Sequence, residues 1–206
     1  MWYVPFLRKQ QTHFFKADSS FNIQFPVNVT LSNNGTGSSL VYTYSTGAFY
    51  PIDGRGFGDQ YNNSGTPHNY GYTFSYNGRF TYQGNEYFKF SGDDDLFVFI
   101  NGRLAINLGG VHSAEDATID LTYPSGGCTR SSYPNVPCAV KNSNATFPCA
   151  CLLGIVPGNG NSYAIDVFYN ERHTSASTLT FTTSIYIQCP YYDWCGICQG
   201  DGQSCW

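Results

Sequence analysis

Three consecutive carboxylates, Asp93, Asp94 and Asp95, stand directly before one of the most apolar runs of the chain, Leu96–Ile100. Adjacent like charges repel one another, and removing them from water is costly unless a positive group compensates. Calcium would compensate, because it takes roughly six to eight oxygen ligands in irregular geometry. The triplet therefore predicts a calcium site; the alternative is a solvated acidic turn before a strand.

This calcium site would not be an EF-hand. A loop that begins at Asp93 would need Gly at its sixth position and Glu at its twelfth, but Val98 and Leu104 stand there. Two histidines, His112 and His173, lie in or near the candidate loops without a Cys or His at the spacing of a zinc site. We therefore expect no zinc there, and interpret both as loop residues that hydrogen-bond locally or contact a ligand.

The composition favours strands and turns over helices. Charged residues make up 12% of the 206 residues, aromatic residues 17%, and 22 residues are glycine. The net charge is -4 and no basic cluster is present, which argues against nucleic acid as a partner. No apolar run approaches the roughly 20 residues that span a bilayer, so we expect no transmembrane segment in this chain.

Alternation of apolar and polar residues predicts most of the strands. They are expected at Tyr72–Tyr76, Phe80–Tyr82, Glu86–Phe90, Leu96–Ile100, Arg103–Leu108, Ala117–Leu121, Tyr163–Tyr169 and Leu179–Gln188. We expect hairpin turns at Asn77-Gly78 and Asn101-Gly102, because Asn-Gly is a strong hairpin signal. No window of helical length has an apolar stripe, so we expect at most one short helix. The pattern predicts an all-β fold, a sandwich or a barrel.

The eight cysteines indicate disulfides and an oxidising compartment. Four glycosylation sequons, at Asn28, Asn34, Asn62 and Asn144, also indicate a secreted glycoprotein. The segment Met1–Gln10 does not resemble a secretory signal, because its apolar part is short and its basic residues follow instead of preceding it. We interpret the chain as a mature form, a fragment or an incomplete product of a secreted protein.

The cysteines fall into two groups of four. The first group lies in a stretch that interrupts the strand pattern, so we expect a loop insertion held by disulfides; it consists of Cys128, Cys138, Cys149 and Cys151. The second group lies in a tail without a core-forming run, and we favour two disulfides there over a zinc half-site or a redox pair; it consists of Cys189, Cys195, Cys198 and Cys205. Eight cysteines allow 105 connectivities, so the pairing stays open.

We therefore expect one recognition domain followed by a small module. The domain is a β-sandwich over residues 1–188, in which residues 1–46 supply strands or wrap around the sandwich and residues 126–160 form the insertion. Residues 189–206 form the Cys-rich tail module.

Four segments of the chain resemble the fibro-slime family, a branch of the β-sandwich domains related to part of the anthrax toxin protective antigen. In order, they are Gly47–Gly58, His68–Gly84, Phe88–His112 and Tyr163–Ile185. The tail resembles a Cys-rich module that repeats after this domain in secreted social-amoeba proteins; the single copy here suggests truncation. The resemblance implies an antiparallel, jelly-roll-like sandwich that serves recognition at cell surfaces or in the extracellular matrix.

The resemblance also implies a calcium site. In the related yeast flocculation adhesins, two consecutive Asp residues joined by a cis peptide hold a calcium ion that ligates sugar hydroxyls directly. The resemblance places this pair on Asp93 and Asp94. It places the second half of the site in the loop after Tyr169, where either Asn170 or Glu171 would be the ligand and where His173 is a further candidate.

Neighbouring residues are candidates for contact with the bound ligand. They are Asp95, His112, Arg172 and Thr174. For Arg172 we favour an ion pair with Glu171 or with an Asp of the triplet. An aromatic platform for a sugar would be Tyr or Phe, because Trp2, Trp194 and Trp206 lie outside the predicted sandwich.

Three classes of function compete. We favour calcium-dependent recognition of a glycan or glycoprotein in cell adhesion. The alternative is a matrix-structural, protein-interaction or signalling module that binds a protein ligand and in which calcium only stabilises loops. A glycoside hydrolase would need two opposed carboxylates roughly 5–10 Å apart. Isolated acids such as Asp59, Glu86, Glu115 and Asp166 imply no such pair, so we do not expect an enzyme.

Overall fold

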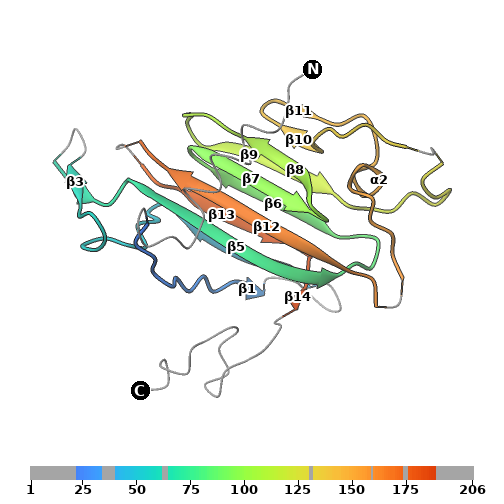
Figure 1. Ribbon diagram of the computed structural model, residues 1–206, viewed down its shortest axis with the longest axis horizontal. Coiled ribbons are helices and arrows are strands. Elements are labelled where there is room, and N and C mark those ends of the chain that lie inside the picture. The colour runs from blue at the N-terminus through green and yellow to red at the C-terminus, as the bar shows by residue number, and fades with distance from the viewer. Residues whose placement is uncertain are drawn as a thin grey trace, which may run out of the picture.

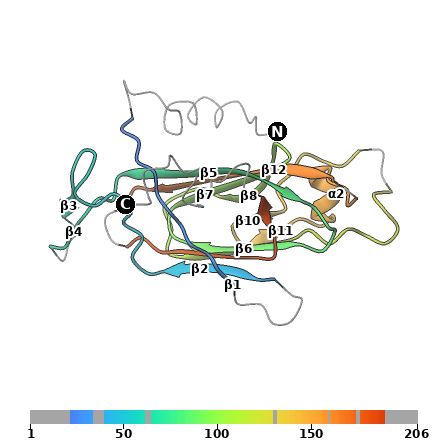
Figure 2. The same ribbon diagram turned by 90° about the horizontal axis from the view of Figure 1, so that it is seen from below.

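The protein is a β-sandwich of two facing sheets, as the two layers in Figure 2 show. The computed structural model describes residues 22–33, 40–61, 65–129, 132–158, 160–173 and 176–188. These ranges contain one short helix, α2 (Cys149–Leu153), and no helix in them is long and apolar enough to cross a membrane. The predicted β-sandwich is therefore confirmed.

The two sheets differ in their number of strands and in whether all neighbouring strands run antiparallel; Figure 1 labels strands of both sheets. The larger sheet has the order β11 (Ser143–Asn144), β10 (Ala139–Val140), β8 (Arg103–Leu108), β7 (Asp95–Ile100), β12 (Ser162–Glu171), β5 (Tyr72–Thr81) and β14 (Ile187–Gln188). The smaller sheet has the order β1 (Ser32–Asn33), β2 (Tyr42–Thr46), β13 (Leu179–Thr183), β6 (Tyr87–Gly92) and β9 (Glu115–Asp120). A separate ribbon pairs β3 (Gln60–Tyr61) with β4 (Pro67–His68). The larger sheet is mixed, because β10 runs parallel to β8.

The core lies between the sheets and follows the period of two expected of strands. On β7, Leu96, Val98 and Ile100 are completely buried. Phe90 of β6 and Tyr169 of β12 meet across the two sheets with ring centroids 6.4 Å apart. The long strands, such as β7 and β12, thus place one apolar face inside the sandwich.

One predicted hairpin is confirmed and the other is wrong. Asn101 and Gly102 join β7 to β8 with positive φ angles of 52° and 69°, as a two-residue turn requires. Asn77 and Gly78, in contrast, lie within the continuous strand β5 and pair with β12. The Asn77 amide donates to Asp166 at 2.8 Å. A Cβ on Gly78 would lie 2.2 Å from the Tyr76 hydroxyl, so the glycine admits that ring and does not make a turn.

The predicted strand Leu179–Gln188 is also not continuous. β13 ends at Thr183, and β14 pairs with β5 in the opposite sheet. The Thr183 hydroxyl donates to the Tyr87 carbonyl at 2.7 Å and accepts the N–H of Ile185 at 2.9 Å. These bonds hold the bend at which the chain changes sheets, and the alternation in the sequence continues through it.

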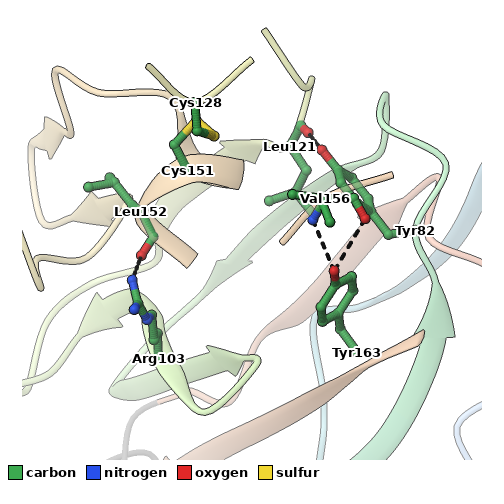
Figure 3. The surroundings of a disulfide bond; sticks show 8 residues. All are labelled: Tyr82, Arg103, Leu121, Cys128, Cys151, Leu152, Val156 and Tyr163. Carbon is green, nitrogen blue, oxygen red and sulfur yellow. Dashed lines mark hydrogen bonds between the residues drawn. A yellow bond between two sulfur atoms is a disulfide. The ribbon is translucent and has the colours of Figure 1, made fainter. Parts of the chain in front are cut away.

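The insertion contains a disulfide, between Cys128 and Cys151 (Figure 3). It also extends the larger sheet through β10 and β11. Arg103 of β8 donates to the Leu152 carbonyl of α2, which ties the insertion to the sandwich (Figure 3). The insertion is therefore part of the packed structure.

The expected disulfide at the other two cysteines of the insertion is not formed. Cys138 and Cys149 are free thiols. A hydrogen bond with Cys149 and burial raise the pKa of Cys138, so the neutral thiol is favoured. The four tail cysteines lie outside the described residues.

Part of the N-terminal region joins the sandwich. β1 and β2 extend the smaller sheet beyond β13. Residues 22–31 precede them, and Figure 2 shows this segment passing from the level of β5 to that of β1. Within residues 22–33 and 40–46, the region therefore supplies two strands and a strap, residues 22–31, that passes from the level of one sheet to that of the other.

Candidate functional site

Three loops meet at one end of the sandwich. They follow β6, β8 and β12, and the strand register brings them together: Asn170 pairs with Asp95, Leu96 with Leu108, and Gly92 with Leu179. The sequence separates the acidic triplet from Glu171 by more than 70 residues, but the antiparallel pairing of β12 with β7 places them side by side.

Asp93 and Asp94 are buried, with exposed fractions of 8% and 2%. Oδ1 of Asp93 accepts the N–H of Thr178 at 2.7 Å and lies 3.3 Å from the hydroxyl oxygen of Tyr169. Oδ2 of Asp94 accepts the N–H of Arg172 at 2.8 Å. Both carboxylates therefore tie the acidic turn to the loop after β12.

The backbone of the acidic turn differs from the one that the resemblance implies. The described residues contain no cis peptide bond, so the bond between Asp93 and Asp94 is trans. Asp94 has a positive φ of 56°, a conformation that Asp tolerates better than most residues. This conformation turns the chain between β6 and β7.

Glu171, and not Asn170, lies inside with these aspartates. Glu171 is 1% exposed; its Oε1 accepts the N–H of His173 at 3.0 Å and its Oε2 accepts the Tyr169 hydroxyl at 3.1 Å. Burial raises the pKa of Glu171 to about 7, with further contributions from the charges of Asp94 and Asp93. Asn170 points to the other face of β12, where its amide donates to Asp95 at 3.0 Å.

Asp95 is already neutralised by a protein cation. Arg172 Nε lies 2.7 Å from Asp95 Oδ2, and Nη2 lies 3.2 Å from Oδ1. Oδ1 also accepts the N–H of Gly110 at 2.6 Å. The predicted ion pair of Arg172 with the triplet is thus confirmed, and it involves the third aspartate only.

A cavity of about 420 Å³ adjoins the two buried aspartates. It is lined by Asp93, Asp94, Val111, His112, Ser113, Ala114, His173, Ala176 and Thr178. His112 contacts the backbone, with Nδ1 2.8 Å from the Ser113 carbonyl and Nε2 3.4 Å from that of Leu108. The two predicted histidines therefore face the same cavity, whereas Thr174 lies outside the described residues.

Thr178 is a member of this site that the sequence analysis missed. Its hydroxyl Oγ1 is buried and has no hydrogen-bond partner among the described residues. A buried hydroxyl without a partner is costly, and it is a common sign of a missing water or ion. Tyr169 and Ser177 were also missed; their hydroxyls lie 3.3 Å apart.

The described residues do not form a ready-made metal site. Within the described ranges, no group of three His, Cys, Asp or Glu side chains is arranged to hold a metal ion. Calcium could be held here only with hydroxyl, carbonyl, water or ligand oxygens in addition to the carboxylates, which suits its preference for hard oxygen ligands.

The acids considered for glycoside hydrolysis lie apart, and each has a local partner. Glu86 accepts the backbone N–H of Gln83, Gly84 and Asn85. The other three bind as follows: Asp59 to the N–H of Gly54, Glu115 to Lys141, and Asp166 to Asn77 across the strands. These contacts hold turns and strands together.

Comparison with curated proteins identifies relatives in Dictyostelium discoideum. The chain is 37% identical to protein psiH over 193 residues, 39% to protein psiI over 192 and 40% to protein psiK over 193. These alignments cover 91%, 91% and 88% of the chain, but 22% of each relative. The chain thus spans about a fifth of the length of the curated relatives it matches. No solved structure matches the sequence significantly.

A family model connects the fold to these relatives. The model for the PA14 domain matches residues 28–201, which include both sheets, the acidic turn and the loop after β12. With relatives of this identity over most of its length, the chain belongs to the PA14 domain family.

Proposed function

We propose that this domain binds calcium through its acidic turn and uses the ion to recognise glycans outside the cell. The observation that carries the proposal is the set of three buried carboxylates of Asp93, Asp94 and Glu171. Among the ion pairs found in the described ranges, none involves these three side chains. Arg172 gives its backbone N–H to Asp94 but its guanidinium to Asp95. A divalent cation would supply the missing positive charge.

Several oxygen atoms support calcium over other ions. The hydrogen bonds that the aspartates accept from the described residues use Oδ1 of Asp93 and Oδ2 of Asp94, so the second oxygen of each is the one proposed to face a cation. Thr178 also lines this cavity, and its buried Oγ1 lacks a partner in the described part of the chain. Glu171 is the candidate ligand from the second loop. All of these are hard oxygen donors, and sugar hydroxyls or water would complete the shell.

Two further observations favour a glycan ligand. PA14 domains are β-sandwiches often involved in carbohydrate binding or adhesion. The cavity of about 420 Å³ lies in the range of small-molecule sites, roughly 300–1,000 Å³. His112 and His173 border it. On this proposal the chain belongs to the fibro-slime branch of the family.

An extracellular location is part of the proposal. The Cys128–Cys151 disulfide and the similarity to the psi proteins support it, because disulfides persist in oxidising compartments. The alternative function is a structural or protein-binding module. The observation in its favour is the hydrogen bond from the N–H of Thr178 to Asp93. This bond joins the loop after β12 to the acidic turn, and in a structural module the ion would stiffen the same two loops.

A glycan array separates the two functions. The purified chain is applied in calcium and again in EDTA, and Asp94→Asn serves as the variant without ion binding. We expect signals that are lost in EDTA and in Asp94→Asn. Calcium binding by calorimetry without any array signal would support the structural module and reject the glycan ligand.

A further inference from the structure

A second and larger groove lies beside the same loops, and we propose that it binds a neutral pyranose ring stacked on Phe57. This inference rests on the proposed function. The groove has a volume of about 890 Å³. Its walls come from residues 22–27, from the loop that carries Phe57, and from the paired ends of β5 and β12. Glu171 and Arg172 line this groove, whereas Asp93 and Asp94 line the smaller cavity.

Phe57 is the most exposed of the large hydrophobic residues in the described ranges, with an exposed fraction of 85%. A single exposed apolar side chain is common and carries no meaning alone. Phe57, however, lines a groove that polar side chains such as Thr73 and Asn170 also line. An exposed ring beside polar groups matches a ligand that has both an apolar face and hydroxyls.

The loop that carries Phe57 is held in place by several contacts. Asp53 binds His68 Nδ1 at 2.6 Å and the N–H of Asn69 at 2.8 Å, and the Asn69 amide donates to the Arg55 carbonyl at 3.1 Å. Arg55 lies over the ring of Phe25 in the strap, 5.7 Å from its centroid. Phe57 is therefore presented by an ordered turn, which lowers the entropy lost on binding.

Glycines on both sides of Phe57 allow this presentation. Gly56 and Gly58 have φ angles of 62° and 86°, which residues other than glycine rarely adopt. A Cβ on Gly56 would also lie 3.7 Å from the Phe25 ring. The turn thus directs the ring of Phe57 to solvent, although burying it in the protein would be favourable.

The polar and charged lining of the groove favours a neutral sugar. Asn170 donates its amide hydrogen to Asp95, which leaves its carbonyl oxygen as an acceptor for a hydroxyl. Arg172 is neutralised by Asp95, and Glu171 is buried. Among the described residues that line the groove, these two are the charged ones, so an acidic sugar would find no unpaired cation there.

The test compares oligosaccharide binding by the whole chain and by Phe57→Ala. An array selects the oligosaccharide with the strongest signal, with cellobiose and lactose as reference disaccharides, and calorimetry gives affinities for sugar and calcium. We expect Phe57→Ala to weaken sugar binding by about 3- to 10-fold, the size of an aromatic contact, without changing calcium affinity. Phe57→Trp should retain sugar binding. Tyr186→Ala, which removes another exposed aromatic residue, is the matched control and should bind as the parent does.

The possible failures are distinguishable. If the parent binds an oligosaccharide and Phe57→Ala binds it equally well, the stacking site is wrong and the proposed function stands. If Phe57→Ala loses calcium affinity to the same extent, Phe57 belongs to the ion site and the separate groove is rejected. If the parent binds no oligosaccharide, both the groove and the glycan function are rejected.

Discussion

Arg172 binds the carboxylate of Asp95 through two nitrogen atoms, with Nε 2.7 Å from Oδ2 and Nη2 3.2 Å from Oδ1. This contact removes one of three adjacent negative charges and leaves the other two without a protein cation in the described structure. Asp93 and Asp94 are thus the candidate calcium ligands of the triplet, and Asp95 is a structural residue that pairs with Arg172. The charge of Arg172 supports the fold next to the proposed ion site and does not compete with the ion.

The first prediction concerns this ion pair. Arg172→Gln should lower the free energy of unfolding by about 1 kcal/mol. The pair is bidentate, which strengthens it, but it is partly exposed to solvent, which limits its contribution. Calcium affinity should change by less than about threefold, because Asp93 and Asp94 keep their backbone contacts. Urea unfolding measures the stability and calorimetry measures the calcium affinity. Arg79→Gln, which removes a hydrogen bond to Ser162 away from the acidic turn, is the control. A large loss of calcium affinity would place the Arg172 side chain within the ion site.

The second prediction decides between the two candidate ligands of the second loop. Glu171→Gln should weaken calcium binding by at least about tenfold, because it removes a buried charged oxygen ligand. Asn170→Ala should change it by less than about threefold, because Asn170 points to Asp95 on the opposite face. Calcium titration by calorimetry measures both. The reverse order of effects would exchange the roles of the two residues.

The third prediction is a pH dependence of the calcium-free protein. Burial raises the pKa of Glu171 to about 7 from its ordinary value of 4.5, so the folded state binds this proton more tightly than the unfolded state. The unfolding free energy should fall as pH rises from about 4.5 to 7, relative to Glu171→Gln. At about 1.4 kcal/mol per pKa unit, the difference approaches about 3 kcal/mol. Urea unfolding of both proteins in EDTA measures it, and parallel pH curves would contradict it.

The fourth prediction concerns the disulfide of the insertion. Cys128 and Cys151 are separated by 23 residues, and a crosslink of this span stabilises by about 3 kcal/mol in the chain-entropy account. Replacing both by serine should lower the unfolding free energy by about that amount. Calcium binding should persist, because the insertion packs beside β8 and not at the ion site. Cys138→Ser, at a free thiol, is the control for loss of a buried sulfur. Equal stability of the double variant and the parent would contradict the prediction.

Local patterns in the sequence predicted much of the fold. The alternation along Leu96–Ile100 and the turn at Asn101-Gly102 suffice to define the hairpin of β7 and β8. The same signal failed at Asn77-Gly78, because pairing with β12 continues through these residues and Tyr76 needs the space above Gly78. A dipeptide cannot show which neighbour its backbone pairs with, so tertiary contacts decided between turn and strand.

The candidate site was predictable in part for a similar reason. The acidic triplet and the second loop were identified, but the role of each residue depends on the face of β12 on which it lies. Tyr169 and Glu171 share the buried face, and extending the alternation by two residues would have pointed to Glu171. No local pattern marks Thr178, because the contact of its N–H with Asp93 and the burial of its hydroxyl arise only in the folded chain.

Calcium titration of the purified chain beside Asp94→Asn tests the central claim most directly. We predict saturable binding by the parent and loss of binding in the variant, because Asp94 is a buried carboxylate whose second oxygen accepts no hydrogen bond from the described residues. Thermal stability of the parent should rise with calcium, because a ligand that binds only the folded state stabilises it. Absence of calcium binding by the folded parent, or equal binding by Asp94→Asn, would contradict the account.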